Sequence, residues 1–222
     1  MVNLQQWEFL NKRCATKKAQ LVAVSKTKPV EAIEALYQAG QRIFGENRAQ
    51  EMQGKFELLP KDIEWHMIGH LQKNKLKYIA PFVSLIHSVD SMALLEEINK
   101  RAAQNNRIIP CLLQVHINKE SQKFGFSIEE LTDTIAIILA KELKNVQING
   151  LMGMASFVDN SIVIRQQFDS LKTLFDQSKE KYFKEDATYK TISMGMSGDF
   201  EIALECGSTM LRVGSSLFGS RS

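Results

Sequence analysis

The sequence predicts an α/β protein built as a single (β/α)8 barrel of the TIM type, and three observations support this fold class. Short apolar segments rich in β-branched residues alternate with longer segments of helical periodicity. Eight such units fit into roughly 200 residues, the lower end of the range for this barrel. The turn after the first strand, residues 25–29, contains no glycine, whereas the alternative, a doubly wound dinucleotide-binding sheet, requires a glycine-rich turn there.

The eight predicted strands are short apolar runs that end at small or polar residues. The first reads Leu-Val-Ala-Val-Ser and the last reads Met-Leu-Arg-Val. We place the strands at residues 21–25, 41–44, 63–68, 83–89, 111–117, 146–152, 189–194 and 210–213. In a barrel of this kind, active groups come from the carboxyl ends of such strands and from the loops that follow them.

Between the strands lie segments whose apolar residues recur at helical spacing. We place helices at residues 30–39, 47–56, 74–79, 91–104, 127–140, 161–181 and 198–206. The serines at positions 91, 127 and 161 are placed to cap the helices that they begin, and Ser127 with Glu130 fits a capping box.

Residues 1–20 are expected to form a short N-terminal helix that closes the bottom of the barrel. Since only residues 220–222 follow the last motif, we expect the whole chain, residues 1–222, to be one domain. Residues 1–20 carry charges at positions 8, 12, 13, 17 and 18 and have no apolar run of the kind found in signal peptides. No segment reaches the roughly 20 apolar residues of a membrane span.

Charge and cysteine content narrow the possible functions. The 28 basic and 25 acidic residues are interspersed and give a net charge of +3, which provides no broad basic face for nucleic acid. Cys14, Cys111 and Cys206 are too widely spaced to indicate a disulfide framework or a zinc site. His66 and His70 are four residues apart, but they flank a predicted strand end, where that spacing does not indicate a metal site. We expect a cytoplasmic monomer without metal, nucleic-acid or membrane partners.

Lys26 follows the first predicted strand and stands where a barrel presents its reactive groups. Partial burial at the barrel mouth and the second cation at Lys28 would both lower the pKa of the Lys26 amine. A neutral amine is what a Schiff base requires. A lysine in such a place is more often a solvated loop residue, so Lys26 by itself does not establish a site.

Two glycine-containing loops follow the seventh and eighth predicted strands, at residues 193–197 and 212–216. These two loops commonly form a phosphate site in this fold. Glycine permits close approach to an anion, hydroxyl groups donate to its oxygens, and a helix that starts nearby presents backbone N–H groups. A Schiff-base lysine facing a phosphate site fits either a phosphorylated aldehyde or keto-sugar substrate, as in an aldolase, or pyridoxal phosphate (PLP). The residues alone leave these two alternatives open.

Seven stretches resemble the motifs of the pyridoxal phosphate homeostasis proteins, a family of PLP-binding barrels related to the N-terminal domain of alanine racemase. The resemblance covers the chain from about residue 21 to its end, in order. The stretches are VSKTKP (24–29), FGEN (44–47), EWHMIGHLQKNK (64–75), HSVD (87–90), GLM (150–152), SMGMSGD (193–199) and GSTMLRVGSSLFG (207–219).

The resemblance implies a set of cofactor-binding residues. It implies that Lys26 holds PLP covalently as a Schiff base and that Asn47 lies near the ring. It further implies that Arg212 contacts the pyridine nitrogen. The phosphate would be held by Ser193, Gly214 and Ser215, where Ser215 replaces the threonine usual in the family.

The same resemblance implies a PLP homeostasis function, in which the protein buffers the cofactor or delivers it to PLP-requiring apoenzymes. Arginine can only donate a hydrogen bond, so Arg212 would leave the ring nitrogen unprotonated and weaken the ring as an electron sink. We therefore expect a carrier rather than an enzyme, with no catalytic residues. Two enzyme alternatives remain, a weak PLP-dependent amino-acid racemase or transaminase and a Schiff-base aldolase without PLP.

Overall fold

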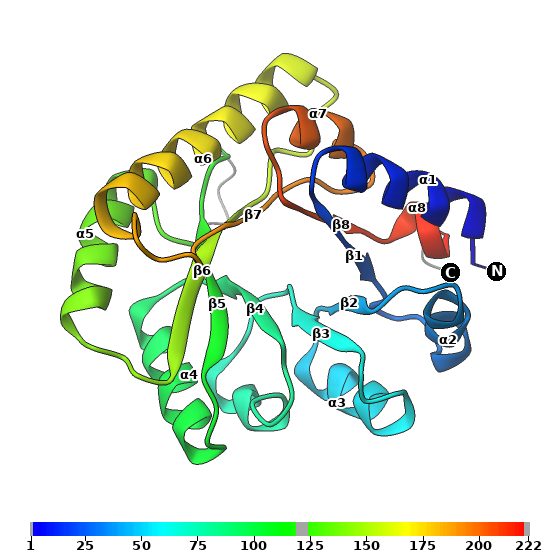
Figure 1. Ribbon diagram of the computed structural model, residues 1–222, viewed down its shortest axis with the longest axis horizontal. Coiled ribbons are helices and arrows are strands. Elements are labelled where there is room, and N and C mark those ends of the chain that lie inside the picture. Colours follow the sequence, from blue (N-terminus) through cyan, green and yellow to red (C-terminus); the bar gives the residue numbers. More distant parts are fainter. Residues whose placement is uncertain (1, 119–123, 220–222) are drawn as a thin grey trace.

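Eight parallel strands form a closed barrel with helices on its outside (Figure 1). The computed structural model describes residues 2–118 and 124–219. Neighbouring strands pair in chain order, and β1 pairs with β8 to close the barrel, so the prediction of a (β/α)8 barrel is confirmed. The strands are β1 (Gln20–Val24), β2 (Ile43–Glu46), β3 (Glu64–Met67), β4 (Leu85–Val89), β5 (Ile109–Val115), β6 (Val146–Gly153), β7 (Thr191–Ser193) and β8 (Met210–Val213).

The helices lie around the barrel wall. None of those in the described ranges has the length and apolar character needed to cross a bilayer. The segment predicted as a helix at 74–79 is a 3₁₀ helix, a form common in short connecting pieces. The helices are α1 (Leu4–Thr16), α2 (Val30–Gln38), α3 (Ala49–Leu58), η1 (Lys73–Tyr78), α4 (Met92–Gln104), α5 (Ile128–Ala140), α6 (Ser161–Tyr182), α7 (Phe200–Glu205) and α8 (Ser215–Phe218).

Side-chain caps fix the start of four of these helices, the first being α1, where the Asn3 side chain accepts from the N–H of Gln6. Ser91 and Ser127 each accept a hydrogen bond from the N–H three residues further on, and Ser127 with Glu130 forms the predicted capping box. The prediction that Ser161 caps α6 is wrong. Asn160 precedes it, and its side-chain oxygen accepts from the N–H groups two and three residues on at 3.1 and 3.2 Å. Asparagine is an equally good cap, so the helix begins one residue earlier than its serine suggests.

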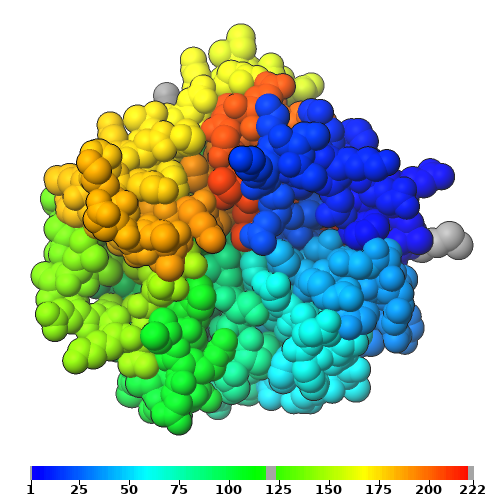
Figure 2. Space-filling view, in the orientation of Figure 1, coloured from blue at the N-terminus to red at the C-terminus, as the bar shows by residue number. Residues whose placement is uncertain are grey.

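The N-terminal helix α1 does not close the bottom of the barrel, contrary to the prediction. It lies in the outer ring beside α7 and α8 (Figures 1 and 2). The ring of Phe9 packs edge-on against Phe200 of α7, and the N–H of Asn3 donates to the carbonyl of Leu217 in α8 at 2.9 Å. Because α8 has only four residues, it cannot cover the β8–β1 seam, and α1 fills that place.

The interior of the barrel has an apolar layer and, nearer the carboxyl ends of the strands, a polar one. Side chains from five strands form the apolar layer: Val22, Leu85, Leu112, Met152 and Met210. Two residues further along their strands lie His87, after Leu85, and Arg212, after Met210. Because alternate residues of a strand point to the same face, these polar side chains also face the interior. The polar layer therefore lies beneath the mouth at the carboxyl ends.

Candidate functional site

The carboxyl ends of β8, β1 and β2 bring three of the predicted site residues together. β1 pairs directly with β2 on one side and with β8 on the other. Lys26, two residues beyond β1, therefore lies between the loop that carries Asn47 and the loop that carries Gly214. All three residues are partly buried, whereas Ser215 at the start of α8 is exposed. Nζ of the nearby Lys28 donates to the carbonyl of Gly219 at 3.3 Å.

Gly214 occupies a position where a side chain has little room. A Cβ atom added there would lie 3.0 Å from the carbonyl oxygen of Val24 and 3.1 Å from its Cβ atom. This is tighter than ordinary van der Waals contact, so a branched side chain would push β8 away from β1 or fill the space beside the Lys26 turn. The glycine thus lets the loop after β8 pack closely against the end of β1.

Beneath the mouth, a chain of hydrogen bonds crosses the barrel interior from β8 to β3. Arg212 donates through Nη2 to the carbonyl of Gly153 at 3.0 Å and through Nη1 to the hydroxyl of Ser193. Ser193 Oγ lies 2.9 Å from His87 Nδ1, and His87 Nε2 lies 3.0 Å from His66 Nδ1. All four side chains are buried, so water does not replace these hydrogen bonds.

Arg212 determines which atom donates and which accepts in each hydrogen bond of this series. A guanidinium group can only donate, so Ser193 accepts from Arg212 and its own O–H is left to donate to His87 Nδ1. His87 then carries its proton on Nε2 and donates to His66 Nδ1. The four side chains therefore form a continuous, satisfied network with a single direction.

Burial determines the charge states in this network. Burial lowers the pKa of His66 to about 3 and that of His87 well below the ordinary range, where the charges of His66 and Arg212 act in the same direction. Burial also lowers the pKa of Arg212 to about 10, against the favourable charge of Asp199. At neutral pH both histidines are therefore neutral and Arg212 is protonated.

Ser193 has a different environment from the one expected of a phosphate ligand. Its hydroxyl lies inside the barrel with Arg212 and His87, and its residue is fully buried. The loop that follows contains a second hydroxyl at Ser197, which is partly exposed. The phosphate role of Ser193 stays a prediction, and Ser197 is a further hydroxyl in the same loop.

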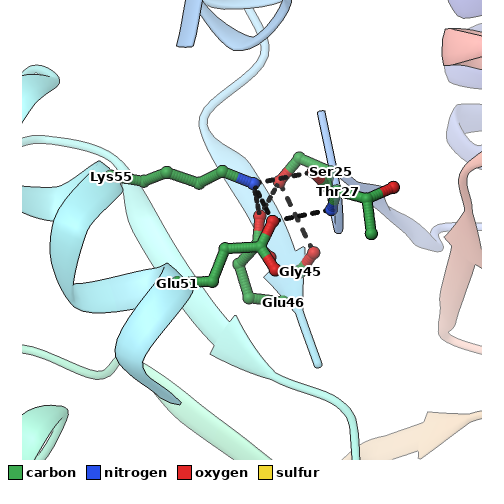
Figure 3. Close-up of polar contacts among 6 residues, drawn as sticks. All are labelled: Ser25, Thr27, Gly45, Glu46, Glu51 and Lys55. Atoms are coloured by element: carbon green, nitrogen blue, oxygen red, sulfur yellow. Dashed lines mark hydrogen bonds and ion pairs between the residues drawn. The ribbon is translucent and has the colours of Figure 1, made fainter. Parts of the chain in front are cut away.

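A charged network on the outer side of β1 and β2 was not predicted from the sequence. Glu46 Oε1 accepts from Ser25 Oγ at 2.6 Å and from Lys55 Nζ at 2.7 Å (Figure 3). Lys55 Nζ also donates to Glu51 Oε1 at 2.7 Å and to the carbonyl of Ser25 at 2.8 Å. Glu51 Oε1 accepts in addition from the N–H of Thr27 at 2.6 Å. The i, i+4 spacing of Glu51 and Lys55 was the one sequence signal that pointed to part of this network.

Glu46 is the most deeply buried charge of this network. Its Oε2 atom is buried without a hydrogen-bond partner among the described residues. Burial raises the pKa of the Glu46 carboxyl, while the charge and hydrogen bond of Lys55 act against this rise. Lys55, together with the hydrogen bond from Ser25, therefore favours the ionised form of the carboxylate and limits the rise of its pKa.

The two histidines at positions 66 and 70 do not meet. His66 is buried in the barrel, whereas His70 Nδ1 lies 2.9 Å from a carboxylate oxygen of Asp90 at the surface. Within residues 2–118 and 124–219, no group of three or more His, Cys, Asp or Glu side chains is placed to hold a metal ion. The three cysteines are buried free thiols.

Comparison with known families identifies the class of this barrel. Residues 4–222 match the family model of the alanine racemase N-terminal domain. The pyridoxal phosphate homeostasis protein of Aquifex aeolicus is 42% identical over 204 residues, which are 91% of this chain and 87% of that protein. The homologue of the same name in Helicobacter pylori strain J99 is 39% identical over 90% of this chain and 86% of its own length. The chain belongs to the pyridoxal phosphate homeostasis protein family.

Solved structures give the same result. PipY of Synechococcus elongatus without PLP is 35% identical, has a TM-score of 0.85, and is matched over 94% of this chain and 99% of its own. The PipY structure with PLP bound has a TM-score of 0.81 over the same shares. An alanine racemase of Clostridium difficile, at 16% identity and a TM-score of 0.74, shares the fold over 61% of its chain.

Proposed function

We propose that this protein holds PLP on Lys26 and serves cofactor homeostasis by buffering PLP or delivering it to apoenzymes. The observation that carries the proposal is the position of Lys26, between the Asn47 and Gly214 loops and above the buried Arg212. Two further findings support it. The chain belongs to a family whose members are named pyridoxal phosphate homeostasis proteins, and the PipY barrel has been solved with PLP bound.

The residues at the mouth fit this cofactor. Lys26 would hold the cofactor covalently, with its Nζ in place of the aldehyde oxygen, which would leave as one water molecule. The backbone at Gly214 and the hydroxyl group of Ser215 would hold the phosphate, as the resemblance implies; the same role for Ser193 would require its buried hydroxyl to give up a contact with Arg212 or His87. Asn47 would lie beside the ring, and Arg212 would direct a donor towards the ring nitrogen. When bound, PLP supplies a reactive aldehyde and an aromatic ring that withdraws electrons.

The charge states beneath the mouth support a carrier rather than an enzyme. Arg212 has a pKa of about 10, so at neutral pH it would donate to a ring nitrogen and would leave that nitrogen without a proton of its own. His87 and His66 are neutral and occupied by their network, which leaves neither ready to act as a general base. We infer a slow removal of any α-proton, in keeping with relatives that are named for homeostasis and not for a reaction.

The three cysteines, all buried as free thiols, support a reducing compartment such as the cytoplasm. We further propose that the protein acts there as a monomer and that PLP enters and leaves at the carboxyl ends of the strands.

The proposal is tested on the purified protein by its visible absorbance before and after borohydride reduction. We expect a band in the visible range that reduction removes, and a single peptide that carries the cofactor on Lys26. A protein without such a band, or with the cofactor on another lysine, would contradict the proposal.

A second measurement separates carrier from enzyme. Adding amino acids should change the spectrum, since an amine can displace Lys26, yet exchange of the α-proton for deuterium should stay far below the roughly 10 s⁻¹ of a median enzyme. If the protein racemises an amino acid at about a tenth of that median rate or faster, and Lys26→Ala loses this activity, the protein is an enzyme and the carrier hypothesis is wrong.

A further inference from the structure

Lys26 lies in a turn whose two adjoining peptide groups are both held by charged side chains. The carbonyl oxygen of Ser25, in the peptide bond before Lys26, accepts a hydrogen bond of 2.8 Å from Lys55 Nζ. The N–H of Thr27, in the peptide bond after Lys26, donates to Glu51 Oε1 at 2.6 Å. Two side chains of α3 therefore fix the backbone on both sides of Lys26 (Figure 3).

These two side chains are themselves held firmly. Lys55 Nζ lies 2.7 Å from both Glu46 Oε1 and Glu51 Oε1, and the side chain of Lys55 is only 8% exposed while that of Glu46 is fully buried. Hydrogen bonds between charged groups are short, directional and stronger in a buried setting. The network thus forms a stiff support behind the turn rather than a loose surface contact.

The backbone of the turn needs such support. Thr27 has a φ of +64°, a left-handed conformation that a β-branched residue rarely adopts. Strained residues of this kind persist only where the surroundings enforce them, and they concentrate at functional sites. The hydrogen bond from the Thr27 N–H to Glu51 is a contact that acts at the strained residue itself.

The contacts of this turn lie on the outer side of the barrel wall. Val22 of β1 faces the barrel interior, whereas Ser25 points outwards to Glu46. The network therefore holds the turn from the side away from the barrel interior.

We propose that Glu51 and Lys55 are positioning residues that hold the turn so that Nζ of Lys26 points into the barrel mouth. This inference rests on the proposed function, in which Lys26 is the site of covalent attachment. Without the two contacts the turn adopts other conformations, and Nζ spends less time where an aldehyde can reach it. The alternative is that the network only stabilises the barrel, in which case the reactivity of Lys26 would not depend on it.

The test measures the reactivity of Lys26 in PLP-free protein. Pyridoxal, which lacks the phosphate, is added, the adduct is trapped with borohydride, and its rate of formation on the Lys26 peptide is followed by mass spectrometry. Glu51→Ala should slow this rate by on the order of tenfold to a hundredfold, since small misplacements of a reacting group have effects of that size. Glu51→Gln should retain most of the rate, because its amide oxygen still accepts from the Thr27 N–H.

Glu97→Ala is the matched control. Glu97 also pairs with a cation four residues on, Arg101, at 2.7 Å, and its side chain is 20% exposed against 23% for Glu51. It lies on α4, away from the turn, so its loss should leave the rate on Lys26 unchanged. Should Glu51→Ala fail to fold, the same comparison is made in a Thr27→Gly background, where glycine accepts a φ of +64° without strain.

The outcomes are distinct. A slow Glu51→Ala beside a fast Glu51→Gln supports the inference. A wild-type rate in Glu51→Ala would overturn the inference. Equal losses of rate in Glu51→Ala and Glu51→Gln would also overturn it, because the rate would then depend on the charge of Glu51 and not on its hydrogen bond to Thr27. A wild-type protein that is labelled elsewhere than on Lys26 would instead show that the proposed function has failed.

Discussion

Replacing Lys55 by methionine keeps the apolar stem of this side chain and removes the cation that pairs with Glu46. The carboxylate of Glu46, whose side chain is fully buried, would then have no partner of opposite charge at 2.7 Å. Breaking a buried ion pair from one side costs about 3–5 kcal/mol of folding free energy. For a chain of this length that lowers the melting temperature by on the order of 10 °C.

The loss should depend on pH in a defined direction. Burial raises the pKa of Glu46 in the folded protein, and Lys55 opposes this rise; in Lys55→Met the pKa of Glu46 therefore rises further. A carboxyl with a raised folded pKa binds more protons in the folded state than in the unfolded state. The folded protein therefore loses stability as the pH rises from the pKa of Glu46 in the unfolded chain towards its higher pKa in the folded protein. The deficit of Lys55→Met should be large at pH 7 and shrink towards acidic pH.

Urea unfolding followed by the fluorescence of the buried Trp65, at a series of pH values, measures both effects. Adding Glu46→Gln to Lys55→Met should recover part of the loss, because the unpaired charge is then gone. Lys184→Met is the control, since Lys184 and its partner Glu180 form an exposed pair and should contribute almost nothing. A deficit below about 1 kcal/mol at pH 7, or one that is the same at every pH, would refute the reasoning.

Three further predictions concern the site. Lys26→Ala should abolish the visible band and the reducible adduct, whereas Lys28→Ala should keep both; spectra and peptide mapping decide this. Gly214→Val should lower the affinity for PLP by at least about tenfold for each charge-assisted hydrogen bond of roughly 1.5–3 kcal/mol that it disrupts. The affinity for unphosphorylated pyridoxal should fall far less. Equal losses in titrations with the two ligands would place the phosphate elsewhere. His66, with a pKa of about 3 in the folded protein, should lower stability as pH falls from about 6.5 towards 3, by up to about 1.4 kcal/mol per unit. His66→Gln should flatten that part of the stability profile.

The barrel could be predicted because its signal is spread over the whole chain. Each strand is a short, largely apolar run of three to eight residues, and a shift of two residues at both ends, as at β2, leaves the order of elements unchanged. The strand predicted at 41–44 runs at Ile43–Glu46. The predicted strand ends at Phe44 because the small residue Gly45 follows. A buried charge at Glu46 is unusual in a strand, and nothing local in the sequence shows that Lys55 compensates it.

The site was predictable only in part, for a related reason. Lys26 and Gly214 follow strands, and the position of a residue after a strand can be read directly from the sequence. The surroundings of Ser193 cannot, because its hydroxyl meets Arg212 and His87 across the barrel. Such contacts depend on which faces of distant strands meet, and strand alternation alone does not specify the pairs.

The position of α1 has a consequence for how the chain reaches its native state. Nε of Arg13 donates to the carboxylate of Glu201 at 3.2 Å, a contact between residues 188 positions apart. Although α1 also meets Gln41 early in the chain, through a hydrogen bond from Trp7 Nε1 at 2.9 Å, its partners in α7 and α8 are made much later. Contacts of such long sequence separation are slow to form, so the seam between the first and last strands should be the last part of the barrel to close during biosynthesis. Until then, the apolar face of α1 is a surface that an unfinished chain presents to chaperones and to other nascent chains.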